Sequence, residues 1–218
     1  YISVPSQMVL AGGVVKLAPG TERLAGALTE LVGCCLHGIL GMRADPGDRV
    51  LIIGDGPIGL TFLQLFRLFG AGYVATSGRR PSRRELAARL GSDEALDARE
   101  VDLKERYEQS LDRVVVATSN IEVTAQAVDL VRPGGDLLLF SGYTYGTMLQ
   151  LDINAVHYRD LHLHGSIDCT VQDFRYAARL LPQLQMETLI TASFPLDRTA
   201  DAFHASRDRD AVKVVIEP

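Results

Sequence analysis

Short apolar runs alternate with helical stretches from residue 49 onward, and this alternation constrains the fold more than any other feature of the sequence. The run at 49–54 is an unbroken series of Val, Leu and Ile before a glycine, as expected of a strand covered on both faces. The stretch at 57–70 has helical spacing, opens with proline and ends at glycine. Strands and helices joined by short connections indicate a parallel sheet between two layers of helices. We therefore predict a doubly wound α/β sheet.

The other elements follow the same rhythm until the sheet is complete. Helices are predicted at 81–91 and at 123–135, where Pro-Gly-Gly stops the helix, and further strands at 73–78, 94–97, 112–119, 136–142 and 161–167. The expected strand order is 3-2-1-4-5-6. The two ends do not fit this rhythm: residues 1–20 suggest two short strands, and residues 194–218 suggest a helix and a final strand. We expect these flanks to belong to a second domain that is only partly present.

A glycine-rich loop lies between the first strand and the first helix of the sheet. The sequence GDGPIG places Gly54, Gly56 and Gly59 in G-x-G-x-x-G spacing, with Pro57 and Ile58 at the helix start. In such a loop the first glycine permits the tight turn, the second lets the backbone approach a pyrophosphate, and the third lets the helix pack close to the strand. The exposed N–H groups of the helix start then face the anion. The alternative is a plain glycine turn.

The end of the second strand is basic where dinucleotide-binding sites often carry an acid. An NAD-selective site places Asp or Glu about 20 residues after the loop, where it accepts hydrogen bonds from the adenosine ribose. This position is taken by Gly78, and the residues around it are Ser77, Arg79, Arg80, Arg83 and Arg84. Guanidinium groups bind a 2′-phosphate bidentately, whereas a carboxylate would repel it. We therefore predict NADP(H) as the coenzyme, bound by Ser77, Gly78, Arg79 and Arg83; the alternative is a solvated, charged helix start.

Composition excludes several other classes of protein. The chain has 218 residues and a net charge of −5, which argues against a nucleic-acid partner. No apolar segment is long enough to cross a membrane, and no signal peptide is visible. Three cysteines, two of them adjacent, cannot form a disulfide framework, so we expect a cytoplasmic protein. Because the chain opens without Met and in strand-like alternation, we expect it to be a piece of a longer polypeptide.

The order of these motifs resembles the medium-chain zinc-dependent alcohol and polyol dehydrogenases, in particular the sorbitol dehydrogenase branch. The resemblance runs through AGALTELVGCCLHGI, GDRVLIIGDGPIG, DLVRPGGDLLLFSG, LHLHGSI and LITASFPLDRTADAF. It implies a GroES-like catalytic domain interrupted by a Rossmann coenzyme domain. On this model the coenzyme domain is residues 33–168, residues 1–32 and 169–218 are remnants of the catalytic domain, and the first part of the catalytic domain lies outside this chain.

The resemblance also implies where zinc would bind in the intact parent enzyme. Family members have a Glu-Pro-Leu at or near the catalytic zinc, and Glu30 stands at this position in the sequence Glu-Leu-Val. We expect Glu30 to be a catalytic and metal-site residue of the parent, with a solvated helix-start carboxylate as the alternative. Cys34 falls where family members line the nicotinamide, although a buried core residue is an equal reading. The chain has neither C-x-x-C nor H-E-x-x-H, so no zinc is expected in this chain itself.

Further coenzyme contacts are implied at the ends of the last three strands. Thr118 and Ser119 would contact the adenosine or its ribose, and Ser141 and Gly142 would lie near the nicotinamide ribose. Ser166 and Ile167 would contact the carboxamide. Ordinary strand-end structure is the alternative at all six positions. Sorbitol dehydrogenases follow with an arginine near this point, but Asp168 stands here, which leaves the substrate class open.

The function implied by the resemblance is hydride transfer between NADP(H) and a secondary alcohol or ketone, such as a polyol, cyclitol or sugar. Zinc would polarise the substrate oxygen in the parent enzyme. Two alternatives stay open: a zinc-independent quinone or enoyl reductase of the same superfamily, and a non-catalytic NADP(H)-binding module. A homodimer joined through the last sheet strand is also expected. The histidines His37, His162 and His164 are interpreted as packing residues.

Overall fold

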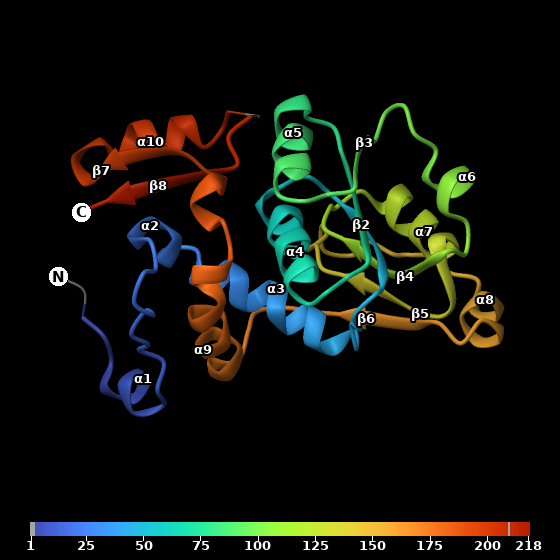
Figure 1. The fold of residues 1–218 in the computed structure, drawn as a ribbon, viewed down its shortest axis with the longest axis horizontal. Helices are drawn as coiled ribbons and strands as arrows, with labels where there is room; N and C mark the ends of the chain where they lie inside the picture. The colour runs from blue at the N-terminus through green and yellow to red at the C-terminus, as the bar shows by residue number, and fades with distance from the viewer. Residues whose placement is uncertain (1–2, 209) are drawn as a thin grey trace.

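The chain is described by a computed structural model at residues 3–208 and 210–218. A six-stranded parallel sheet with the order β3-β2-β1-β4-β5-β6 forms its centre (Figure 1). Its strands are β1 Arg49–Ile53, β2 Tyr73–Gly78, β3 Glu94–Asp97, β4 Leu111–Val116, β5 Val131–Leu139 and β6 His162–Gly165. The predicted doubly wound α/β fold and its strand order are confirmed.

Helices cover both faces of this sheet. They are α3 Thr29–Gly41, α4 Pro57–Leu68, α5 Pro81–Arg89, α6 Leu103–Tyr107, α7 Ile121–Leu130, α8 Ile153–Tyr158 and α9 Val171–Leu180. Proline occupies the first turn of α4 and of α5, where its missing N–H costs no helical hydrogen bond. Outside the sheet lie α1 Ser6–Leu10, α2 Arg23–Gly26, β7 Ile190–Pro195, α10 Thr199–Ala205 and β8 Lys213–Glu217. None of the helices in the described ranges has the length and apolar character that a membrane crossing requires.

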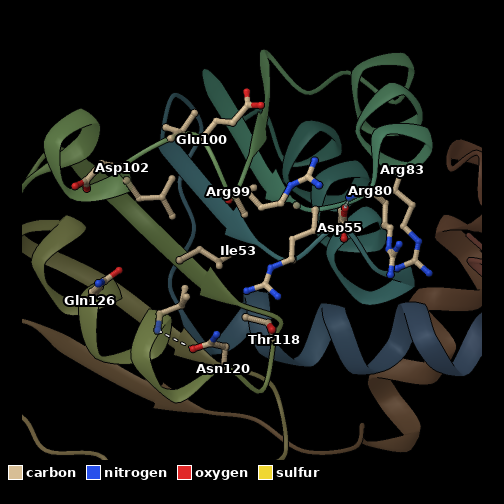
Figure 2. A pocket seen from close by; sticks show the side chains of 18 of the residues that line it. Ile53, Asp55, Arg80, Arg83, Arg99, Glu100, Asp102, Thr118, Asn120 and Gln126 are labelled. Atoms are coloured by element: carbon tan, nitrogen blue, oxygen red, sulfur yellow. Dashed lines mark hydrogen bonds between the residues drawn. The ribbon is translucent and has the colours of Figure 1, made fainter. Parts of the chain in front are cut away.

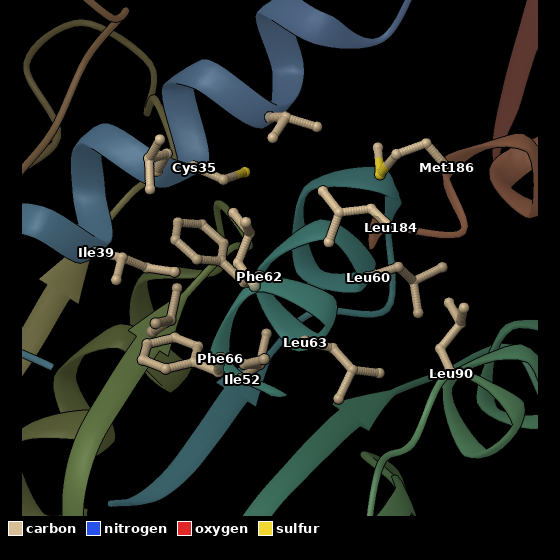
Figure 3. Close-up of a cluster of buried hydrophobic side chains, with 14 of the residues drawn as sticks. Cys35, Ile39, Ile52, Leu60, Phe62, Leu63, Phe66, Leu90, Leu184 and Met186 are labelled. Carbon is tan, nitrogen blue, oxygen red and sulfur yellow. The ribbon is translucent and has the colours of Figure 1, made fainter. Parts of the chain in front are cut away.

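The strands send alternate side chains into two separate cores. Val50 and Ile52 of β1 face the core formed with α3, α4, α5 and α9, whereas Leu51 and Ile53 face the core formed with α6, α7 and α8. Figure 3 shows the first core, in which Phe62 of α4 lies between the sheet and α3. This burial on both faces explains why β1 is apolar at consecutive positions.

The chain ends form a separate layer beside the sheet. Helix α9 packs against α3, and its C-terminal continuation places Leu184 and Met186 in the same core as α4. Strands β7 and β8 then pair in parallel, with α10 between them in sequence, at the end of the molecule where the N-terminal segment also lies (Figure 1). The helix and strand predicted within 194–218 are present. The domain boundaries near residues 32 and 168 stay a prediction.

Three local predictions were wrong. Residues 3–20 contain α1 and no strand, because no described segment offers the backbone partner that a strand requires; residues 1 and 2 lie outside the described part. The predicted helix at 123–135 ends at Leu130, and β5 runs through the Pro-Gly-Gly sequence, since proline cannot donate the next helical hydrogen bond. Strands β4, β5 and β6 also end two or three residues earlier than predicted, which leaves their polar ends in loops.

Candidate functional site

A groove of about 750 Å³ opens at the carboxyl ends of β1, β2, β3 and β4 (Figure 2). In a doubly wound sheet this edge, beside the point where the strand order reverses between β1 and β4, is where ligands bind. Its lining residues include Gly54, Asp55, Ser77, Gly78, Arg79 and Arg80. The loops after β3 and β4 form the opposite wall.

The glycine loop after β1 meets steric demands that only glycine satisfies. Gly54 has φ +129°, and a Cβ there would lie 2.7 Å from the carbonyl oxygen of Ala117. A Cβ at Gly59 would lie 1.9 Å from the carbonyl oxygen of Gly54, so α4 packs directly on the loop. Gly56 is the N-cap of α4, and no side chain caps the helix there. The N–H groups of the first helical turn are therefore free to bind an anion.

The end of β2 carries a buried hydroxyl that lacks a partner. Ser77 is 2% exposed, and its Oγ has no hydrogen-bond partner among the described residues, although the residue lines the groove. Buried polar groups in proteins are nearly always hydrogen-bonded. An oxygen-rich ligand in the groove would satisfy this hydroxyl, so the residues here fit the adenosine end of a dinucleotide.

An acidic side chain occupies the space beside Gly78. A Cβ at Gly78 would lie 2.2 Å from Cγ of Asp55, the middle residue of the GDG sequence. Oδ2 of Asp55 accepts a hydrogen bond of 2.9 Å from the backbone N–H of Arg80. Sequence reasoning missed Asp55, and its only signal was the presence of an acid inside the glycine motif. The end of β2 is therefore less basic than its own sequence indicated.

The arginines after β2 have different surroundings. Arg79 and Arg80 line the groove, and their guanidinium groups form no hydrogen bond or ion pair with any described residue. Arg83 also lines the groove (Figure 2). Its Nη2 donates to the carbonyl oxygen of Ala211 at 2.6 Å. Arg84 pairs with Asp97 at 2.9 Å and does not line the groove. Arg79 and Arg80 are thus the cations most available to a ligand, and sequence reasoning had not assigned a contact to Arg80 individually.

Asp97 at the end of β3 fixes two further cations. Arg99 donates to both of its carboxylate oxygens, at 2.9 Å from Nε and 2.6 Å from Nη2. These bonds from Arg99, together with the nearby Arg84, hold the pKa of Asp97 well below its usual range. Arg99 lines the groove, but its charge is already compensated.

The other predicted coenzyme residues are spread along the same edge of the sheet. Thr118 and Ser119, after β4, line the groove. Four glycine-loop residues do not line the groove and form the start of α4: Gly56, Pro57, Ile58 and Gly59. The predicted residues after β5 (Ser141 and Gly142) and after β6 (Ser166 and Ile167) also lie outside the groove, further along the carboxyl ends of the strands. The buried hydroxyl of Ser166 has no hydrogen-bond partner in the described part of the chain, whereas Ile167 is 83% exposed.

Glu30 lies outside the groove, in the first turn of α3. It is exposed, and its Oε1 accepts a hydrogen bond of 3.1 Å from the thiol of Cys34. Burial, and secondly Glu30, raise the pKa of that thiol, and Cys169 is also a neighbour. No group of three or more His, Cys, Asp or Glu side chains in the described ranges could hold a metal ion. The residues present therefore do not form a zinc site.

The histidines pair with acidic side chains. Nδ1 of His37 lies 2.9 Å from Oδ2 of Asp173, which also caps the start of α9. Nε2 of His164 lies 2.5 Å from Oδ1 of the buried Asp136. Both contacts connect structural elements, as packing residues do.

Comparison with known proteins places this geometry in a wider context. Residues 57–183 match the family model described as zinc-binding dehydrogenase. A sorbitol dehydrogenase of Halalkalibacterium halodurans is 27% identical over 210 residues, which cover 93% of this chain and 61% of that protein. An L-galactonate-5-dehydrogenase of Escherichia coli is 29% identical, with 99% of this chain and 64% of that protein covered. The chain thus spans about three-fifths of the length of these relatives.

A solved structure shares the fold and contains a coenzyme. It belongs to a protein of Sinorhizobium meliloti described as a zinc-binding dehydrogenase bound to NADP, with a TM-score of 0.88 and 26% identity. The match covers 94% of this chain and 62% of that one.

Proposed function

Since the chain belongs to the zinc-binding dehydrogenase family, we propose that its groove binds NADP(H) as the coenzyme of an alcohol dehydrogenase. The bound nicotinamide supplies the hydride acceptor or donor. We propose a secondary alcohol or its ketone as the substrate of the longer protein, within the polyol, cyclitol and sugar class. The sorbitol and L-galactonate dehydrogenases among the relatives support this substrate class.

The observation that carries the coenzyme proposal is that the guanidinium groups of Arg79 and Arg80 and the nearby hydroxyl of Ser77 have no partner among the described residues. In our proposal the two arginines bind the 2′-phosphate, and Ser77 donates to the adenosine ribose or its phosphate. Gly54 and Gly56 let the backbone approach the pyrophosphate, which accepts hydrogen bonds from the first turn of α4. The NADP-bound structure of a relative supports this coenzyme.

The chemistry at the substrate oxygen is not assigned to residues of this chain. The side chains of residues 3–208 and 210–218 do not fit a zinc ion. We propose that Glu30 contributes to a zinc site that residues outside this chain complete, which its exposure on α3 and the family resemblance support. We also propose that residues 33–168 form the coenzyme domain and that residues 1–32 and 169–218 belong to a catalytic domain. The free cysteines support a further proposal, that the protein is cytoplasmic.

Titration with both coenzymes tests the proposal. Charge-assisted hydrogen bonds contribute about 1.5–3 kcal/mol each, so the loss of two corresponds to about 10²–10⁴ in affinity. We expect NADPH to bind more tightly than NADH by a factor toward the lower end of this range, and we expect Arg79→Ala and Arg80→Ala each to remove much of the difference. Arg89→Ala, which removes an exposed arginine from the far end of α5, is the matched control. The chain has no tryptophan, so coenzyme fluorescence can be followed directly. Equal dissociation constants for the two coenzymes would contradict the NADP(H) assignment.

A second measurement separates coenzyme binding from catalysis. The described residues form the groove, but they do not form a cluster of side chains that could hold a metal ion. We therefore expect this chain to bind NADPH but not to reduce NADP⁺ in the presence of polyols. We expect elemental analysis to find no zinc in it. Polyol-dependent NADP⁺ reduction above background would show that the assignment of catalysis to residues outside the chain is wrong.

A further inference from the structure

Asp55 places a carboxylate where the side chain of residue 78 would be. The hypothetical Cβ of Gly78 comes within 2.2 Å of both Cγ and Oδ2 of Asp55, so a side chain at position 78 would collide with Asp55 unless the loop after β1 shifted. The glycine at position 78 therefore does not leave an empty space at the end of β2. It leaves room for an acid that comes from the neighbouring loop after β1.

The carboxylate is held in place by one oxygen and is open at the other. Oδ2 accepts the backbone N–H of Arg80 at 2.9 Å, which fixes the side chain against the start of α5. Oδ1 has no hydrogen-bond partner among residues 3–208 and 210–218, and Asp55 is a half-buried residue of the groove wall. Figure 2 shows Asp55 next to Arg80, with the loop after β4 across the groove.

An acid at the end of the second strand affects how a coenzyme's adenosine 2′ group binds. In NAD-binding sheets an acid at the end of the second strand accepts a hydrogen bond from the adenosine 2′-hydroxyl. A carboxylate close to a 2′-phosphate is instead repelled by it. Here Asp55 supplies such an acid while Arg79 and Arg80 supply cations, so the groove contains recognition groups for both coenzymes.

We propose that Asp55 is a specificity-determining residue for the coenzyme: its Oδ1 accepts the adenosine 2′-hydroxyl of NAD(H), and its charge opposes the 2′-phosphate of NADP(H) that Arg79 and Arg80 attract. The inference rests on the proposed coenzyme function. It implies that the groove binds both coenzymes and that Asp55 keeps the preference for NADP(H) smaller than the arginines alone would make it.

The substitution that tests this is Asp55→Asn. An asparagine carbonyl oxygen can accept the same N–H of Arg80, so we expect the loop to be preserved while the charge is removed. We expect NADPH to bind about tenfold more tightly and NADH several-fold more weakly, which raises the ratio of the two dissociation constants by at least about tenfold. Glu85→Gln, which removes an exposed carboxylate from α5 outside the groove, should leave the ratio within about twofold of the wild type.

A measurement on the wild-type chain covers the case in which the variant does not fold. ADP-ribose and its analogue lacking the adenosine 2′-hydroxyl are compared as competitors of NADPH, and we expect the analogue to bind about tenfold more weakly. An unchanged coenzyme ratio in a folded Asp55→Asn variant overturns the inference, and so does equal binding of the two competitors. If wild-type chain binds neither coenzyme, the proposed function itself fails and the inference fails with it.

Discussion

Gly59 of helix α4 lies directly against the loop after β1. A Cβ there would lie 1.9 Å from the carbonyl oxygen and 2.9 Å from the carbonyl carbon of Gly54. Because the obstacle is backbone, no side-chain rotation can relieve it. At Gly56, by contrast, a Cβ would meet no atom within 4 Å. The two glycines therefore have separable roles.

We expect Gly59→Ala to destabilise the fold by about 1–3 kcal/mol, since α4 must move away from the sheet, and to weaken both coenzymes alike. Gly56→Ala is the matched comparison: it should change stability little but weaken both coenzymes, because its methyl group would stand where the pyrophosphate approaches. Urea unfolding followed by circular dichroism measures the first effect, and fluorescence titration the second. Wild-type stability of Gly59→Ala would refute the packing role.

At this scale, sequence reasoning identified the residues defined by local spacing and missed those defined by contact. The glycine motif, Ser77 and the arginine cluster were all recognised from their order after strands. The position of Asp55 depends on how closely the loop after β1 approaches Gly78 of β2, and the partners of Arg83 and Arg84 come from distant segments. Those contacts are consequences of tertiary structure that the spacing of residues does not encode.

Among the elements, a buried ionic network connects strands of the sheet near their amino ends. Arg113 of β4 is 5% exposed and pairs with Asp136 of β5 at 2.8 Å and with Asp48, just before β1, at 3.1 Å. Asp136 also contacts His164 of β6 at 2.5 Å. The network thus connects β1, β4, β5 and β6 at the edge opposite the groove.

We expect Arg113→Met to destabilise the fold by about 3–5 kcal/mol, because two buried carboxylates lose their cation. Coenzyme affinity of the folded fraction should stay unchanged, since the groove lies at the other edge. Arg132→Met, which removes a partly exposed ion pair with Asp112, is the control and should cost less than about 1 kcal/mol. A similar loss of stability in both variants, measured by urea unfolding, would argue against a special role for the network.

The pairing of Asp97 at the end of β3 makes stability depend on pH. Its pKa is lowered in the folded state by Arg99 and Arg84, so the stabilisation is complete above the unfolded pKa of about 4 and is lost as the pH falls below it toward the folded pKa. We expect the difference in urea midpoint between wild type and Asp97→Asn to be constant from about pH 7 to pH 5 and to shrink below about pH 4. A difference that changes between pH 7 and pH 5 would assign the effect to other groups.

Elements that bury both faces were predictable, whereas those that depend on a partner were not. The unbroken apolar runs of β1 and β4 and the proline-initiated helices α4 and α5 are present close to the predicted positions. Residues 3–20 contain neither of the strands predicted within 1–20, and β7 was missed although it pairs with the correctly predicted β8. A strand's existence at the edge of a fold depends on what lies beside it, which its own sequence does not specify.

For the whole molecule, β6 is the strand that limits the sheet on one side, next to β5. It is short, and Leu163 on it is 36% exposed. An unpaired edge presents backbone groups to a second copy of the same edge, and such pairing across a two-fold axis closes on itself. The homodimer predicted from the sequence would use this edge.

We expect the chain to be a dimer by light scattering at micromolar concentration and Leu163→Lys to shift it toward the monomer, because a charged side chain disfavours edge pairing. Leu196→Lys, at an exposed leucine outside the sheet, should leave the mass unchanged. A monomeric wild-type chain, or equal effects of the two substitutions, would count against β6 as the interface.

The contact between Asp55 and Gly78 also limits how coenzyme preference can evolve. A Cβ at position 78 would lie 2.3 Å from the Cβ of Asp55 as well as 2.2 Å from its carboxylate, so replacing the acid by another side chain would not make room there. A carboxylate at position 78 needs either a glycine at position 55 or a shift of the loop after β1. The two positions therefore have to change together, and no single substitution moves the acid from the loop to the strand.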